Sequence, residues 1–145
     1  MAPSAVTEST MGEQDDRKRV LFVCVENANR SQMAEAFAHI HGGEGLEAFS
    51  AGSRPSGRIN PAAVASMREL GYDLSSHRSK SLSQVPDVAY DLVVTMGCGD
   101  DCPAIRALRR LQWEIPDPKL MDPDQFRAVR ELIRQKVVAA LKGLE

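Results

Sequence analysis

A cysteine, an arginine and a serine near the start of the sequence have a spacing that suits anion chemistry. Cys24 directly follows residues 20–23, whose apolar and β-branched composition is typical of a buried strand. After five residues come Arg30 and Ser31, and Ser31 begins a segment with the apolar spacing of a helix. A loop that leaves a strand and ends at a helix N-terminus presents several backbone N–H groups, which bind oxyanions and stabilise a thiolate. The sequence therefore predicts an oxyanion site with Cys24 as its nucleophile.

The residues around Cys24 supply the other groups that such a site needs. The planar guanidinium of Arg30 suits a tetrahedral oxyanion, and the hydroxyl of Ser31 can donate to a thiolate at Cys24. The Gly-x4-Gly-Lys pattern of ATP-binding loops is absent. We expect the side chain of Glu26 to point outward while its backbone N–H faces the anion. The expected oxyanion-binding loop consists of Val25, Glu26, Asn27, Ala28, Asn29 and Arg30.

Asp117 is a candidate acid. It stands between two prolines on a stiff loop after a predicted strand. If this loop faces the bound oxyanion, a protonated Asp117 can deliver its proton to a departing oxygen. An aspartate in a turn is by itself more often structural, but a position at the same sheet edge as Cys24 favours the catalytic interpretation.

Two further cysteines, Cys98 and Cys102, lie in a loop that contains glycine. Residues four apart in a helical turn are separated by about 6 Å along the axis, which is within disulfide range. In a cytosolic chain such cysteines are more often redox-active or catalytic than structural. Zinc needs about four ligands. Because the histidines add no second paired motif, we expect no metal site; they are His39, His41 and His77.

Strand and helix patterns alternate along the chain, which gives these residues a scaffold. Strands are expected at residues 20–23, 46–51, 92–95 and 111–115. Helices are expected at residues 31–41, 61–70, 103–108 and from 122 onward, with a short helical piece near 81–85. Val64, Met67 and Leu70 should point inward from the second helix. The last helix should carry one apolar stripe made of Phe126, Val129, Ile133, Val137, Ala140 and Leu141.

This alternation predicts an α/β fold, namely a single three-layer domain with a four-stranded parallel sheet flanked by helices on both faces. Ligands of such sheets bind beyond the C-terminal ends of the strands. We therefore expect the loops at residues 24–30, 97–102 and 116–118 to meet there.

Length and composition limit the possible functions. The 145 residues suit a flexible N-terminal tail at 1–17 and one domain at 18–145. The net charge of −2 and the lack of a basic, aromatic-rich stripe argue against nucleic-acid binding. No apolar run reaches membrane-spanning length, and the N-terminus lacks a signal-peptide pattern, so we expect a cytoplasmic chain without a membrane partner. We expect it to be a monomer.

The sequence resembles the arsenate reductases built on the low-molecular-weight tyrosine phosphatase fold. The resemblance covers nearly the whole domain and implies a phosphatase-like fold and the reduction of arsenate to arsenite in arsenical resistance. In the thioredoxin-coupled branch of the family, three cysteines act in relay. The motifs that carry the resemblance are Cys24-Val-Glu-Asn-Ala-Asn-Arg-Ser-Gln-Met-Ala-Glu35, Ser50-Ala-Gly52, Asp91-Leu-Val-Val-Thr-Met96, Cys102-Pro103 and Asp117-Pro118.

The resemblance also implies a role for each site residue. Cys24 is similar to the nucleophile of the family. Cys98 and Cys102 are similar to its second and third redox cysteines, and these two would form a redox-active disulfide. The order in which these two attack stays open, because they are closer together than in the best-known thioredoxin-coupled members. Asn27 helps to hold the loop, Arg30 and Ser31 stabilise the anion and the thiolate, and Asp117 is the general acid. Arsenate is the implied substrate, with no tightly bound cofactor and with thioredoxin or another thiol system as external reductant.

Two other functions stay open at this point. A low-molecular-weight protein tyrosine phosphatase needs the nucleophile, the arginine and the acid, but neither Cys98 nor Cys102. Such phosphatases tend to place aromatic residues after the Asp-Pro pair, where this chain has Lys119-Leu-Met. A non-catalytic, thiol-based anion-sensing module would turn over neither substrate.

Overall fold

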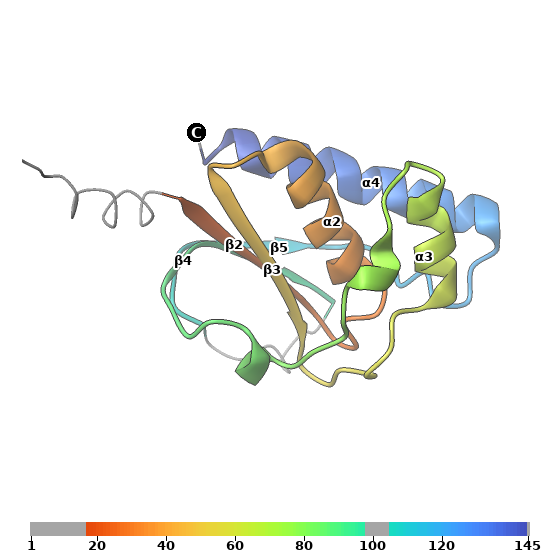
Figure 1. Ribbon diagram of the computed structural model, residues 1–145, viewed down its shortest axis with the longest axis horizontal. Coiled ribbons are helices and arrows are strands. Elements are labelled where there is room, and N and C mark those ends of the chain that lie inside the picture. The colour runs from red at the N-terminus through yellow and green to blue at the C-terminus, as the bar shows by residue number, and fades with distance from the viewer. Residues whose placement is uncertain (1–16, 98–104, 145) are drawn as a thin grey trace, which may run out of the picture.

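The computed structural model describes residues 17–97 and 105–144, and a four-stranded parallel sheet lies at their centre (Figure 1). Its strands are β2 (Lys18–Cys24), β3 (Leu46–Gly52), β4 (Tyr90–Met96) and β5 (Ala107–Trp113), in the spatial order β3-β2-β4-β5. The helices are α2 (Arg30–Gly42), α3 (Pro61–Arg68) and α4 (Pro123–Lys142), with short 3-10 turns η2 (Leu74–Ser76) and η3 (Leu82–Gln84). The predicted α/β class and parallel sheet are confirmed.

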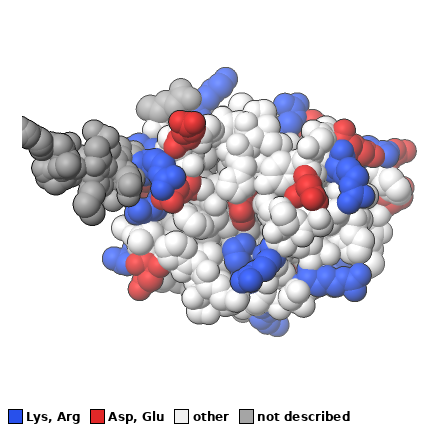
Figure 2. Space-filling view, viewed as in Figure 1, with Lys and Arg blue, Asp and Glu red and all other residues white. Residues whose placement is uncertain are grey.

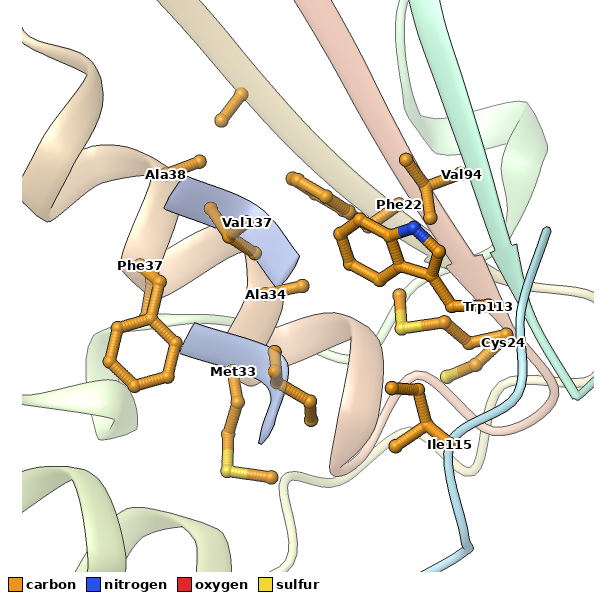
Figure 3. Packing of buried hydrophobic residues seen from close by; sticks show 14 of the residues in the cluster. Phe22, Cys24, Met33, Ala34, Phe37, Ala38, Val94, Trp113, Ile115 and Val137 are labelled. Carbon is orange, nitrogen blue, oxygen red and sulfur yellow. The ribbon is translucent and has the colours of Figure 1, made fainter. Parts of the chain in front are cut away.

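Alternating side chains along the strands build a core on each face of the sheet. Val20, Phe22 and Cys24 of β2 belong to the larger core, to which α2, α3 and α4 all contribute. Figure 3 shows Phe22 of β2 in this core with Phe37 of α2 and Val137 of α4. Leu21 and Val23 point to the opposite face and belong to a smaller cluster. The partly buried residues that cover this smaller cluster include Leu82, Val85, Val88 and Ile105.

The distribution of helices differs from our expectation of helices on both faces. Within the described ranges, α2, α3 and α4 pack on the larger core, and η3 with the chain after it covers the opposite face. Pro86 explains why η3 is short, because a proline cannot continue a helix whose amides must donate to the preceding turn.

Helix α4 packs beside α2 on the larger core, as Figure 1 shows. Asp122 caps α4 by accepting a hydrogen bond of 2.8 Å from the N–H of Gln125, whose side chain bonds back to the Asp122 N–H. The predicted apolar stripe is confirmed, since Phe126, Val129, Ile133, Val137 and Leu141 are buried and Ala140 packs against them.

Two predictions about elements are wrong. Residues 107–108 belong to strand β5 and not to a helix, while residues 103–104 lie outside the described part of the chain. Backbone pairing with β4 determines this segment, and Leu108 is 79% exposed, so its apolar character does not mark a buried helix face. Leu70 is 43% exposed because α3 already ends at Arg68.

Strand β5 forms one edge of the sheet, where Arg109 and Arg110 are exposed. Basic and acidic side chains are interspersed over the face of the molecule seen in Figure 2. Among the described residues, no helix combines the length and the apolar character needed to cross a membrane.

The register of the parallel strands brings their C-terminal ends together. Cys24 at the end of β2 pairs with Gly52 at the end of β3, and Met96 of β4 pairs with Trp113 of β5. The loops that follow β2, β4 and β5 therefore leave the same end of the sheet, beyond the C-terminal ends of its strands, where ligands of such folds bind.

Candidate active site

The loops that follow the C-terminal ends of the strands enclose a pocket of about 300 Å³. The loops after β2 and β5 meet there as predicted, and Gly97 joins them directly after β4. Cys98 and Cys102 lie outside the described residues. The pocket is lined by Cys24, Val25, Glu26, Asn29, Arg30, Gly97 and Asp117.

The backbone of the loop after β2 is oriented for anion binding. Four of its carbonyl oxygens accept hydrogen bonds of 2.8–3.1 Å from the N–H groups of residues 53, 54, 56 and 60. Since C=O and the following N–H of a trans peptide point in opposite directions, the next N–H groups face away from that segment. An oxyanion cradle needs this orientation. The four N–H groups belong to Val25, Glu26, Asn27 and Asn29.

Gly52 lets the end of β3 approach this loop. A Cβ atom at this position would lie 2.5 Å from the carbonyl oxygen of Val25 and 3.0 Å from the nitrogen of Asn27. The first distance is too short for any side chain, and the atom concerned is backbone, so glycine is required for the loop to pack against β3.

Cys24 is buried and lies beside Trp113 and Ile115 at the end of the larger core (Figure 3). Its Sγ is 2.8 Å from the Oγ of Ser31. The side-chain N–H of Asn27 donates to the same Oγ over 2.7 Å, so the hydroxyl hydrogen of Ser31 is available for the sulfur. This contact confirms the predicted proximity of Ser31 and Cys24.

Asn27 holds the loop in shape through its side-chain amide. It is fully buried and has a left-handed backbone with φ of 52°, a conformation that asparagine tolerates better than most residues. Its Nδ2 donates to Ser31 and, over 3.1 Å, to the Oγ of Ser50. Its Oδ1 accepts from the N–H of Lys80 at 2.9 Å and from Nε2 of Gln32 at 2.7 Å. Asn27 therefore ties the loop to three other segments.

Arg30 reaches from the start of α2 into the pocket. Its Nη1 donates to the carbonyl oxygen of Ile115 over 3.1 Å, and its Nη2 lies 3.9 Å from Oδ2 of Asp117. Gly97 has a φ of 79° and lies against the guanidinium, so that a Cβ atom there would overlap it. The arginine is thus held at 8% exposure between the ends of β4 and β5.

Asp117 and Glu26 both line the pocket. The side chain of Asp117 is half exposed, and its Oδ1 accepts from the N–H of Lys119 over 3.1 Å. The Nζ of Lys119 is 3.2 Å from Oε2 of Glu26. Glu26 therefore points outward, as predicted, and its ion pair joins the anion loop to the Asp117 loop.

Sequence reasoning missed the polar groups that lie behind the anion loop. Burial raises the pKa of Glu35, but hydrogen bonds from His39 and Ser50 and the charges of Lys80 and His77 lower it more, so the net shift is downward. Burial lowers the pKa of His77. One signal in the sequence could have found them: Glu35 stands in an otherwise apolar stretch of α2. A carboxylate buried at such a position needs polar partners nearby.

Comparisons with known proteins agree with this geometry. Residues 19–145 match the family model "Low molecular weight phosphotyrosine protein phosphatase". The "Glutaredoxin arsenate reductase" of Synechocystis sp. is 35% identical over 123 residues, which cover 83% of this chain and 93% of that protein.

Two solved structures extend the comparison. One is "An arsenate reductase in the phosphate binding state", with a TM-score of 0.81, 32% identity and coverage of 88% of this chain and 99% of that one. The other is the Corynebacterium glutamicum "thioredoxin-dependent arsenate reductase", with a TM-score of 0.72, 34% identity and coverage of 92% and 65%.

Proposed function

Because this chain belongs to the low molecular weight phosphotyrosine protein phosphatase family, and within it to the arsenate reductases, we propose that it reduces arsenate to arsenite. One observation carries the proposal: the buried Sγ of Cys24, 2.8 Å from the Ser31 hydroxyl, lies at a pocket that Arg30 and Asp117 also line. A thiolate, a guanidinium and a carboxyl group around one pocket suit nucleophilic attack on an oxyanion.

In the first step, the Cys24 thiolate attacks arsenic and forms an As–S bond. One As–O bond breaks, and Asp117 protonates the departing oxygen. The Ser31 hydroxyl stabilises the thiolate before attack, and the loop N–H groups and Arg30 bind the remaining oxygens of the anion.

In the second step, the Cys98 thiolate attacks the sulfur of Cys24. A Cys24–Cys98 disulfide forms, and the electron pair of the As–S bond passes to arsenic, which leaves as arsenite. Two observations support Cys98 as the attacking residue: it directly follows Gly97 in the chain, and Gly97 lines the pocket.

In the third step, Cys102 attacks Cys98 and releases the Cys24 thiolate. The resulting Cys98–Cys102 disulfide accepts two electrons from an external dithiol and returns both thiols to the reduced state. The names of the relatives support a reductant of the glutaredoxin or thioredoxin class. Such a cycle operates in a compartment that keeps thiols reduced, so we place the chain in the cytoplasm.

A phosphatase activity is the less favoured alternative. Among the described residues, those that line the pocket include no aromatic side chain, and the Glu26–Lys119 ion pair stands beside it. A phenol ring would therefore lack the stacking partner that an aryl phosphate site provides. Aryl phosphate hydrolysis remains useful as a control reaction, since it needs Cys24 but no electrons.

The proposal is tested by arsenate-dependent oxidation of reduced thioredoxin and, in parallel, of a glutaredoxin system. We expect Cys98→Ser and Cys102→Ser each to lower this rate by about 100-fold, since a serine oxygen cannot complete the disulfide. Both variants should retain p-nitrophenyl phosphate hydrolysis at the level of the parent chain. Cys24→Ser should abolish both reactions.

Each alternative predicts a different outcome of the same assays. Parental arsenate reduction by both late-cysteine variants would refute the relay, and activity in Cys24→Ser would refute the whole mechanism. Aryl phosphate hydrolysis without arsenate reduction would identify a phosphatase, and turnover of neither substrate would identify an anion-sensing module. After one equivalent of arsenate, mass spectrometry should find a two-dalton loss on the peptides that hold Cys98 and Cys102.

A further inference from the structure

Three side chains outside the anion pocket bring metal-ligating atoms together. Glu35 and His39 are four residues apart on α2 and share one face of the helix, and His77 follows η2. One ligand atom from each of the three lies within 4.8 Å of the other two. The Oε2 of Glu35 is 3.0 Å from Nε2 of His39 and 3.8 Å from Nδ1 of His77. Ligands about 2.0–2.2 Å from a tetrahedral zinc ion are separated by about 3.4 Å, so these distances bracket the required value.

We propose that Glu35, His39 and His77 bind one divalent transition-metal ion, for which zinc is the representative. A carboxylate oxygen with two imidazole nitrogens is a donor set that suits zinc, whereas magnesium and calcium prefer oxygen alone. The side chain of His39 is 41% exposed, which gives an ion a route from solvent and leaves a further coordination position for water. None of the three residues lines the anion pocket.

The carboxylate of Glu35 is oriented for this role. The hydroxyl of Ser50 donates to Oε1 over 2.6 Å, while Oε2 faces both imidazoles. A hydrogen bond to the oxygen that does not bind the ion fixes the carboxylate and is a common feature around metal ligands. The carboxylate is 12% exposed, so bulk water competes little for it.

The protonation of His77 follows from its neighbours. The Nε2 of Gln32 donates to Oδ1 of Asn27 and to the carbonyl oxygen of Arg78, so Oε1 of Gln32 is the atom that faces Nδ1 of His77, at 2.9 Å. The metal-free His77 therefore carries its proton on Nδ1, and the hydroxyl of Tyr72 donates to Nε2 over 2.7 Å.

Metal binding must reverse this tautomer. Nδ1 of His77 has to lose its proton to bind the ion, and the proton moves to Nε2, where the oxygen of Tyr72 accepts it. The bond from His77 to Gln32 is lost in exchange for the metal bond. A change of tautomer at His77 is therefore the spectroscopic signature of the proposed site.

Lys80 limits the affinity of the site. Its Nζ is 3.7 Å from Oε1 of Glu35 and 3.5 Å from Oγ of Ser50, so a bound cation would be repelled by a partly buried ammonium group. Substitution Lys80→Gln keeps a polar side chain and removes this charge. This substitution should tighten zinc binding. If Glu35 served only as the ion-pair partner of Lys80, the substitution would not change zinc binding.

The test uses the full chain with its three cysteines replaced by serine, so that thiolates do not compete for the ion. The sequence contains three histidines, and His41 lies outside the cluster. Long-range nitrogen–proton NMR spectra therefore report the two histidine ligands and an internal control in one sample. At one equivalent of zinc, the ring nitrogens of His39 and His77 should shift, His77 should change tautomer, and His41 should keep its signals.

Competition with a chromogenic zinc chelator measures the affinity of matched variants. His39→Asn should weaken binding at least about tenfold, and His41→Asn should leave it unchanged. Because His39 is exposed, its replacement should preserve the fold, which circular dichroism checks. Equal zinc affinity of His39→Asn and the parent would overturn the proposal, as would equal shifts of all three histidines. The chain used here cannot reduce arsenate, so the result is independent of the arsenate reductase proposal.

Discussion

At the scale of single residues, the direction of one hydrogen bond decides how Cys24 is held. Ser31 accepts from Asn27 and therefore offers its hydrogen to the Cys24 sulfur. A hydrogen bond to a charged group contributes about 1.5–3 kcal/mol, which corresponds to roughly 10- to 150-fold in rate. We expect Ser31→Ala to lower kcat/KM for arsenate within this range. The control is Ser83→Ala on η3, outside the pocket, which should match the parent; equal rates for both variants would contradict the role of Ser31.

Gly97 allows a second residue-scale prediction. Substitution Gly97→Ala strains a backbone with φ of 79° and adds a Cβ atom that overlaps the guanidinium of Arg30. We expect a loss of about 1–3 kcal/mol in the free energy of unfolding and a KM for arsenate raised by about tenfold or more, because Arg30 must move. Urea denaturation and steady-state kinetics measure the two effects.

Gly57 provides the matched control for this substitution. It has a φ of 83°, but a Cβ atom there would meet no other atom within 4 Å. Gly57→Ala should therefore lower the free energy of unfolding while leaving the KM for arsenate unchanged. A raised KM in both variants would mean that general destabilisation, and not Arg30, causes the effect.

The sequence predicts the residues of the anion loop better than the residues that support it. The order Cys24, Arg30, Ser31 along the chain determines which groups surround the anion, because all three belong to one strand–loop–helix segment. The supporting contacts of Asn27 and Arg30 join residues far apart in sequence, such as Lys80 with Asn27 and Ile115 with Arg30. No local pattern marks such contacts.

At the scale of elements, a charged cluster joins α3 to α4. Glu69, which follows α3, lies 2.8 Å from Nη2 of Arg127 and 2.7 Å from Nη1 of Arg130. Hydrogen bonds from both arginines lower the pKa of Glu69 to about 2. The contact is formed by the ionised carboxylate, so its contribution to stability depends on pH.

This dependence has a definite sign. Since the pKa of Glu69 is lower in the folded chain, its contribution is present above about pH 4.5 and is lost as pH falls toward 2. We expect Glu69→Gln to be less stable than the parent at pH 6, with the difference shrinking between pH 5 and pH 2. Thermal unfolding across this range measures it. Glu44→Gln, in the turn between α2 and β3, is the control; a constant difference for Glu69→Gln would contradict the prediction.

The errors at element scale have a common physical origin. The segment before Trp113 has apolar residues at helical spacing, yet it forms β5 because β4 offers backbone partners from Tyr90 to Met96. Helix α4 was predicted well because its start is capped locally by Asp122 and Pro123 and its stripe is long. The sequence predicts a helix well where residues at its start cap it, as in α4. It predicts a strand such as β5 less well, because pairing with a strand distant in sequence determines it.

At the scale of the whole molecule, the parallel topology explains why so much of the site could be predicted. Successive parallel strands of an alternating α/β chain end on the same side of the sheet, so Cys24, Gly97 and Asp117 meet although they are far apart in sequence. The cluster of Glu35, His39 and His77 escaped the same reasoning. His77 reaches α2 from a turn with no regular period, and only the packed fold shows that contact.

The position of β5 at the edge of the sheet has a consequence for how the chain behaves in crowded solution. An edge strand exposes backbone N–H and C=O groups that a strand of another molecule can pair with, and the exposed Leu108 adds an apolar contact. Arg109 and Arg110 place two positive charges on that edge, so two copies brought together there repel each other. Their charge therefore disfavours ordered aggregation through this strand, whatever chemistry takes place at its end.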